Sequence, residues 1–132
     1  MTALPTRIHC DHIHLRSRDA VAAGAFYVDR LGAREVGREG EPVSRVILDL
    51  GGLTLFIEQA PEGLPPAAPA PHLGIEHIGL GVSDIEATYA ELRRRGVTIV
   101  SGITDVRPGL RVIFIEGPDA VRIEFLQRSD PG

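Results

Sequence analysis

The sequence predicts an α+β fold made of two paired βαβββ modules, and three observations lead to this prediction. An offset of 65 residues places the segment that begins at His12 on the segment that begins at His77, with the same residue types recurring in order. An offset of 66 then places Arg45 on Arg111 and Glu58 on Glu124. In each copy, a stretch with apolar residues at alternate positions precedes a stretch with helical spacing. The chain is therefore two copies of one structural unit. Because both copies should adopt the same structure, the repeat predicts the overall topology.

Both copies begin with a strand and a capped helix. Residues 11–16 and 76–82 alternate apolar and polar side chains, as expected for strands with one buried face. Asp19 in the first copy, and Ser83 or Asp84 in the second, supply the side-chain acceptors typical of a helix N-cap. The helices end at Gly32 and Gly96, because glycine tolerates the left-handed conformation of a helix C-terminus.

Three shorter strands complete each copy. We expect them at about 33–38, 43–50 and 52–59 in the first copy, and at about 97–101, 110–116 and 120–127 in the second. Glycine-containing turns separate the last two strands of each copy. The whole chain, 1–132, is expected to be one domain: module one at about 8–60, a proline-rich linker at about 61–73, and module two at about 74–128.

Composition narrows the class of protein. Of the 132 residues, 43 % are hydrophobic and 24 % are charged, which is typical of globular domains. The formal charge of −4 provides no basic surface for nucleic acid, and the sequence contains no long apolar stretch for a membrane. The single cysteine, Cys10, cannot form an internal disulfide. We therefore expect a cytoplasmic protein that binds neither nucleic acid nor membranes.

Four residues stand at matching places in the two copies and indicate a metal site. His12 and His77 lie in the first strands, and Glu58 and Glu124 lie in the last. Imidazoles and carboxylates together suit zinc, nickel, manganese, cobalt or ferrous iron. A carboxylate inside an apolar strand, as at Glu124, is costly to bury unless a cation or donor accompanies it, and Arg122 is an alternative partner. The pattern predicts one divalent ion, of undetermined identity.

Four segments carry a resemblance to a known family. They are residues 11–15, 26–32, 74–86 and 117–125, and together they resemble the vicinal oxygen chelate superfamily, the glyoxalase/bleomycin resistance protein/dioxygenase family. The resemblance implies curved mixed sheets around a cup-shaped cavity, a small-molecule substrate and a homodimer, with modules paired within a chain or exchanged between chains. It also implies His12, His77 and Glu124 as metal ligands.

The fourth ligand position is open between two residues. An overlay without gaps puts Glu58 on Glu124. If the longer turn of the second copy absorbs two residues, Phe56 takes that position instead. Both residues lie on the same strand face, so periodicity does not distinguish them.

The identity of the fourth residue bears on the expected reaction. With Glu58, the resemblance implies a glyoxalase I-like lyase or isomerase, in which the metal chelates two substrate oxygens and stabilises an enediolate while Glu124 or Glu58 moves a proton. With Phe56, two histidines and one carboxylate resemble the ferrous centre of an extradiol dioxygenase. A third possibility is a protein that binds a drug or metabolite without catalysis. We expect the lyase or isomerase. His14, on the face of His12, is a candidate base, substrate contact or structural group.

Overall fold

Two four-stranded mixed sheets and two helices make up the protein, as a computed structural model describes it for residues 2–129. The first module consists of β1 (Ile13–Ser17), α1 (Ala20–Leu31), β2 (Arg34–Glu39), β3 (Arg45–Leu50) and β4 (Leu53–Gln59). The second consists of β5 (Ile78–Gly81), α2 (Ile85–Arg94), β6 (Thr98–Arg107), β7 (Leu110–Glu116), a 3-10 turn (Pro118–Ala120) and β8 (Arg122–Arg128). The sheet orders, β1-β4-β3-β2 and β5-β8-β7-β6, are the same. The predicted α+β fold of two βαβββ modules is confirmed.

The helix ends follow the predicted chemistry. Asp19 and Asp84 are the N-caps, and each carboxylate accepts a hydrogen bond at 3.0 Å from the backbone N–H three residues later. Gly32 ends α1 with φ 78°, a left-handed conformation that a residue with a Cβ adopts only at a cost. In α2 the C-cap is Arg95, and Gly96 follows it in the left-handed conformation with φ 73°.

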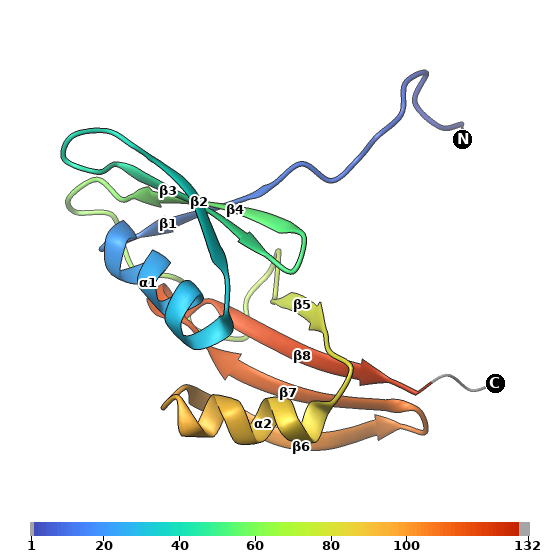
Figure 1. Cartoon of the computed structure of the whole chain (residues 1–132). Helices are drawn as coiled ribbons and strands as arrows, with labels where there is room; N and C mark the ends of the chain where they lie inside the picture. The colour runs from blue at the N-terminus through green and yellow to red at the C-terminus, as the bar shows by residue number, and fades with distance from the viewer. Residues whose placement is uncertain (1, 130–132) are drawn as a thin grey trace.

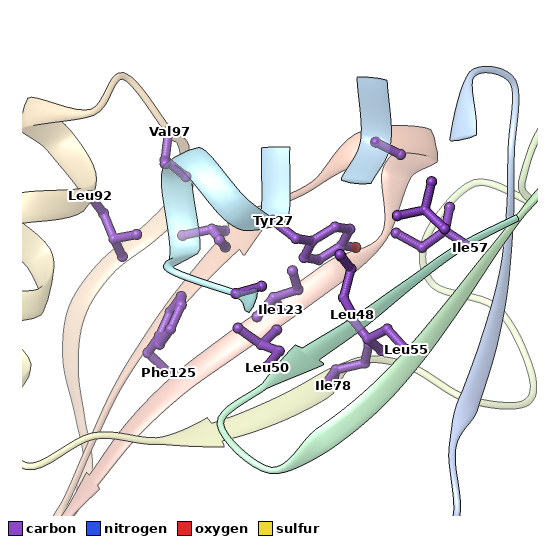
Figure 2. Close-up of a cluster of buried hydrophobic side chains, with 14 of the residues drawn as sticks. Tyr27, Leu48, Leu50, Leu55, Ile57, Ile78, Leu92, Val97, Ile123 and Phe125 are labelled. Carbon is purple, nitrogen blue, oxygen red and sulfur yellow. The ribbon is translucent and has the colours of Figure 1, made fainter. Parts of the chain in front are cut away.

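One continuous core lies on the helix side of both sheets. Alternate residues of β3 and β4, such as Leu48 and Leu55, are fully buried against α1, and alternate residues of β7 and β8, such as Ile115 and Ile123, are buried in the second module. Figure 2 shows side chains from both modules in this cluster, among them Tyr27 of α1. Because strand side chains alternate between faces, the residues between these buried ones point away from the core.

Contacts between the modules place α1 at their junction (Figure 1). The two modules exchange equivalent hydrogen bonds, since the Arg30 guanidinium donates to the Arg95 carbonyl and the Arg95 guanidinium donates to the Arg30 carbonyl, the latter at 3.3 Å. Asp119 of module two also accepts a hydrogen bond at 3.1 Å from the Arg18 backbone N–H. A reciprocal contact between equivalent residues indicates that the two modules are related by approximate two-fold symmetry. Within one chain, the axis of this symmetry passes between the C-terminal ends of α1 and α2.

Several boundaries differ from the prediction. β1 and β5 begin one residue after His12 and His77, so these histidines precede the strands instead of lying inside them. β6 is longer than expected and continues to Arg107, with three register irregularities that let it follow β7. Residues 2–11 form an exposed extended arm ahead of β1 (Figure 1). No helix in residues 2–129 has the length and apolar character needed to cross a membrane.

Candidate metal centre

The predicted ligands lie on the sheet faces that point away from the core. Glu124 alternates with buried Ile123 and Phe125 on β8, and Phe56 alternates with buried Leu55 and Ile57 on β4. The two histidines precede the strands that pair with these two, β5 and β1. Each module therefore carries two of the four predicted positions, and we call each pair a half-site.

The half-site of module two pairs His77 with Glu124. Nε2 of His77 lies 3.6 Å from Oε1 of Glu124, and only 18 % of the Glu124 side chain is exposed. Two donors on one tetrahedral zinc ion, each about 2.1 Å from it, would be about 3.4 Å apart. This pair of donors fits one divalent ion without large rearrangement.

The half-site of module one pairs His12 with an aromatic ring. The His12 imidazole stacks on Phe56 with ring centroids 4.0 Å apart and an angle of 20° between the planes. The Arg45 guanidinium carbon lies 5.1 Å from the centre of the same ring. Phe56 offers no donor atom, so His12 is the only residue of this pair that can bind an ion.

The strand register identifies the residue at the fourth position. Ile13 on β1 pairs with Leu55, and its counterpart Ile78 on β5 pairs with Ile123. Leu55 therefore corresponds to Ile123, and the next residue, Phe56, corresponds to Glu124.

The glutamine side chains that follow confirm this alignment. The Gln59 side chain accepts from the backbone N–H at the start of α1 at 2.9 Å, and the Gln127 side chain accepts from the equivalent N–H of α2 at 2.7 Å. Of the two residues left open by the sequence, Phe56 is the one that aligns with Glu124. The pairs Ile47–Phe56 and Phe114–Glu124 put one of the two extra residues before β7 and the other in the turn before β8.

Glu58 lies one position further along β4 on the same face and belongs to an ion-pair cluster. Its carboxylate contacts Arg45 at 3.0 Å, His14 Nε2 at 3.3 Å and Arg16 at 3.8 Å. The hydrogen bond from Arg45 is the main reason that the pKa of Glu58 lies below its usual value. His14 is thereby placed beside a carboxylate, as a polar neighbour of His12.

A single chain does not bring the four predicted ligands together. Residues 2–129 contain no group of three or more His, Cys, Asp or Glu side chains positioned to hold one ion. In one chain the modules contact each other through their helix sides, whereas Phe56 and Glu124 alternate with buried residues and point away from that contact. The metal site therefore stays a prediction, and the two half-sites of one chain are separate.

Sequence reasoning missed two acidic residues beside the histidines. Asp11 Oδ2 lies 2.7 Å from His12 Nδ1, and Glu76 Oε2 contacts His77 Nδ1. These hydrogen bonds are the largest cause of the lowered pKa of both carboxyl groups. Arg122, considered earlier as a partner of Glu124, instead donates to Glu76 at 3.0 Å. The sequence does contain a signal for these two residues, because an acidic residue immediately precedes each of the two repeated histidines.

A cavity of about 270 Å³ lies beside the second half-site. His14 and His77 both line it, together with Ile75, Val121 and Arg122. A longer groove of about 630 Å³ follows β5 and is lined by His77, Gly79, Gly81 and mainly aliphatic side chains. Each space is large enough for a small organic molecule.

Comparison with known proteins relates the whole domain to one family. The profile described as Glyoxalase/Bleomycin resistance protein/Dioxygenase superfamily matches residues 9–125. The protein YwbC of Bacillus subtilis (strain 168) is 31 % identical over 126 residues, which cover 89 % of this chain and 96 % of YwbC. A probable lactoylglutathione lyase of Synechocystis sp. is 40 % identical over 57 residues, which cover 42 % of this chain and 44 % of that protein.

Solved structures agree with this relationship. A glyoxalase family protein from Enterococcus faecalis is 25 % identical and superposes with a TM-score of 0.75, covering 92 % of this chain and 98 % of that one. The predicted superfamily and fold are thus confirmed. The chain belongs to the glyoxalase/bleomycin resistance protein/dioxygenase superfamily.

Proposed function

We propose that this protein is a metal-dependent enzyme whose centre is made by His12 of one chain and by His77 and Glu124 of a second chain in a homodimer. The observation that carries the proposal is the pair of matching half-sites on the outer faces of the two modules, with Phe56 aligned to Glu124. A second chain supplies what each half-site lacks. This requirement is the reason to propose a dimer with the site shared between chains.

The donor set is two imidazoles and one carboxylate. Three protein ligands leave coordination positions open for substrate, which is the arrangement of catalytic zinc and of non-haem iron sites. A divalent ion bound there would polarise and hold two adjacent oxygens of a small molecule. Nickel, manganese and cobalt accept the same donors, so the donor set does not name the metal.

The remaining residues of the faces would orient such a substrate. Phe56 presents an apolar ring where a fourth ligand would otherwise be, and it keeps water from that side of His12. His14, Glu58 and Arg45 form a polar cluster on the same face, able to donate to or accept from a second polar group of the substrate. Glu124, the least exposed carboxylate of the set, can take or return a proton beside the chelated oxygens.

Two histidines and one carboxylate are also the ligand set of non-haem Fe(II) oxygenases, so oxidative cleavage of a catechol-like diol is the first candidate reaction. In that reaction both atoms of O₂ enter the product as the ring opens next to the two hydroxyl-bearing carbons. The test is anaerobic loading with Fe(II), followed by oxygen uptake with a panel of catechols. We expect uptake that the His77→Ala variant lacks. Absence of uptake with iron-loaded protein across the panel would refute the dioxygenase.

A glyoxalase I-like lyase or isomerase is the second candidate, and the partial similarity to lactoylglutathione lyases favours it. Here Glu124 would move the proton between neighbouring carbons of an α-oxygenated substrate. The corresponding assay is formation of lactoylglutathione from methylglyoxal and glutathione, with Zn(II), Ni(II) and Co(II) supplied in turn. Activity in this assay, with no oxygen consumed, would select the second candidate. A protein that takes up no divalent metal would support a binding protein without catalysis.

We also propose the cytoplasm as its location, because the one cysteine, Cys10, is free and exposed.

A further inference from the structure

Both predicted histidine ligands have an acidic neighbour that is not part of the proposed ligand set. Each follows an acidic residue whose carboxylate contacts its Nδ1 atom: Asp11 beside His12, and Glu76 beside His77. Asp11 and Glu76 occupy equivalent positions of the two modules. The contact therefore occurs twice in the chain, each time at the Nδ1 atom of the histidine.

Such a contact determines which nitrogen is free to bind a metal. A neutral imidazole carries one N–H and one lone pair, and an ionised carboxylate can only accept a hydrogen bond. A carboxylate at Nδ1 therefore favours the proton on Nδ1 and leaves the lone pair on Nε2. In module two, Nε2 is the atom that faces Glu124.

The Glu76 carboxylate is itself held in place. Its Oε2 contacts His77, while its Oε1 accepts a hydrogen bond at 3.0 Å from Arg122. Asp11 is more open to solvent, with 74 % of its side chain exposed against 46 % for Glu76. An exposed hydrogen bond competes with water, so the contact at Glu76 is the stronger constraint.

We infer that Glu76, anchored by Arg122, is a positioning residue that holds His77 in the Nδ1–H tautomer with Nε2 directed at the metal site. The inference rests on the proposed metal-binding function and adds to it a residue outside the ligand set. Asp11 performs the same role for His12 with a smaller effect. Loss of an outer-shell partner of this kind costs about 10–100-fold in metal affinity in metalloproteins.

The first test needs no metal. Long-range ¹H–¹⁵N NMR correlations of the metal-free full-length protein report the tautomer of each histidine. We expect His77 to carry its proton on Nδ1 in the wild type and to shift toward the Nε2–H form in Glu76→Ala. The matched control is Glu86→Ala, which removes an exposed glutamate that pairs with Arg111 at 3.1 Å. An unchanged His77 tautomer in Glu76→Ala would overturn the inference.

The second test measures affinity with Co(II), whose visible absorption reports binding directly. We expect Glu76→Ala to weaken the Kd by about 10–100-fold, Asp11→Ala to weaken it less, and Glu86→Ala to leave it unchanged. Glu76→Gln keeps the side-chain shape and one acceptor oxygen, so it should weaken binding by a smaller but measurable factor. It is the deciding variant if thermal denaturation shows that Glu76→Ala is unfolded.

The two possible failures are distinguishable. If the wild type binds no Co(II), the proposed function is wrong, whereas the tautomer measurement still tests the contact. If the wild type binds Co(II) and both Glu76 variants bind it within threefold of the wild type, the metal site survives and the positioning role is wrong.

Discussion

Replacement of Glu58 by glutamine tests whether Phe56 or Glu58 is the counterpart of Glu124, because the two alignments predict different losses of metal affinity. If Phe56 holds the fourth position, Glu58 does not bind the ion directly. It acts on the ion only through its charge, from two residues further along the strand. Two residues along a strand span about 6.8 Å, and a carboxylate at that distance in water strengthens binding of a divalent ion by a factor of about 8. Physiological salt reduces this to a factor of about 2–3. We therefore expect Glu58→Gln to weaken Co(II) binding by less than tenfold.

A ligand would behave differently. Loss of a carboxylate bonded to the ion should exceed the roughly 10–100-fold cost of losing an outer-shell partner. The assay is Co(II) titration monitored by absorption, with His77→Ala as the variant that should lose stoichiometric binding. Glu39→Gln is the matched control, because Glu39 also pairs with Arg45, at 3.7 Å, but lies on β2. Weakening of more than 100-fold by Glu58→Gln alone would refute the alignment that places Phe56 opposite Glu124.

Three further predictions concern stability. Gly24→Ala should destabilise the protein by about 1 kcal/mol, because the new Cβ would lie 3.0 Å from buried Val46 Cγ1 and this overpacking exceeds the gain in helix propensity. Chemical denaturation measures the free energy of unfolding, and unchanged stability would contradict the close packing of α1 on β3. Ala120→Gly should stabilise by about 1 kcal/mol, since Ala120 has φ 61°, and thermal denaturation should show a higher Tm. The hydrogen bonds from its two arginine partners lower the pKa of Glu91 from 4.5 to about 2, so its contribution to stability is present above pH 4.5 and is lost as the pH falls through 2. The difference in Tm between wild type and Glu91→Gln should therefore shrink as the pH falls from 4.5 and vanish below 2.

Much of the fold follows from local sequence signals. The capping carboxylates Asp19 and Asp84 and the terminal glycine Gly32 act on backbone groups within a few residues, so their roles are readable without tertiary structure. The internal repeat then supplies the topology, because a second copy of one module must bury the same helix-covered face.

The pairing of strands is not local, and the fourth ligand position depends on it. Phe56 and Glu58 share a face of β4, so alternation fits either one, and only the hydrogen-bonded register with β1 distinguishes them. The overlay without gaps failed because the second module has one extra residue before β7 and another in the turn before β8, at connections where length changes are tolerated.

The relative placement of the modules was equally beyond sequence reasoning. Pseudo-two-fold symmetry is compatible with an axis through the ligand faces or through the helix ends. In one chain the reciprocal Arg30–Arg95 contact identifies the second. The orienting role of Glu76 likewise depends on a side-chain rotamer and on Arg122, which is 46 residues away in the sequence.

A site shared between chains makes a prediction that a site within one chain cannot. In a heterodimer of His12→Ala and His77→Ala chains, one shared site loses both histidines and the other keeps both, so one of the two sites should bind Co(II) although neither parental homodimer does. The reciprocal control is a heterodimer of a wild-type chain with a His12→Ala/His77→Ala chain, in which each shared site lacks one histidine and neither should bind. A site within one chain reverses both results, leaving the first heterodimer empty and the second with one intact site. Co-expression with two affinity tags isolates each heterodimer, and Co(II) stoichiometry decides between them. Because the half-sites of one chain lie on faces that point away from its core, we expect binding in the first heterodimer only.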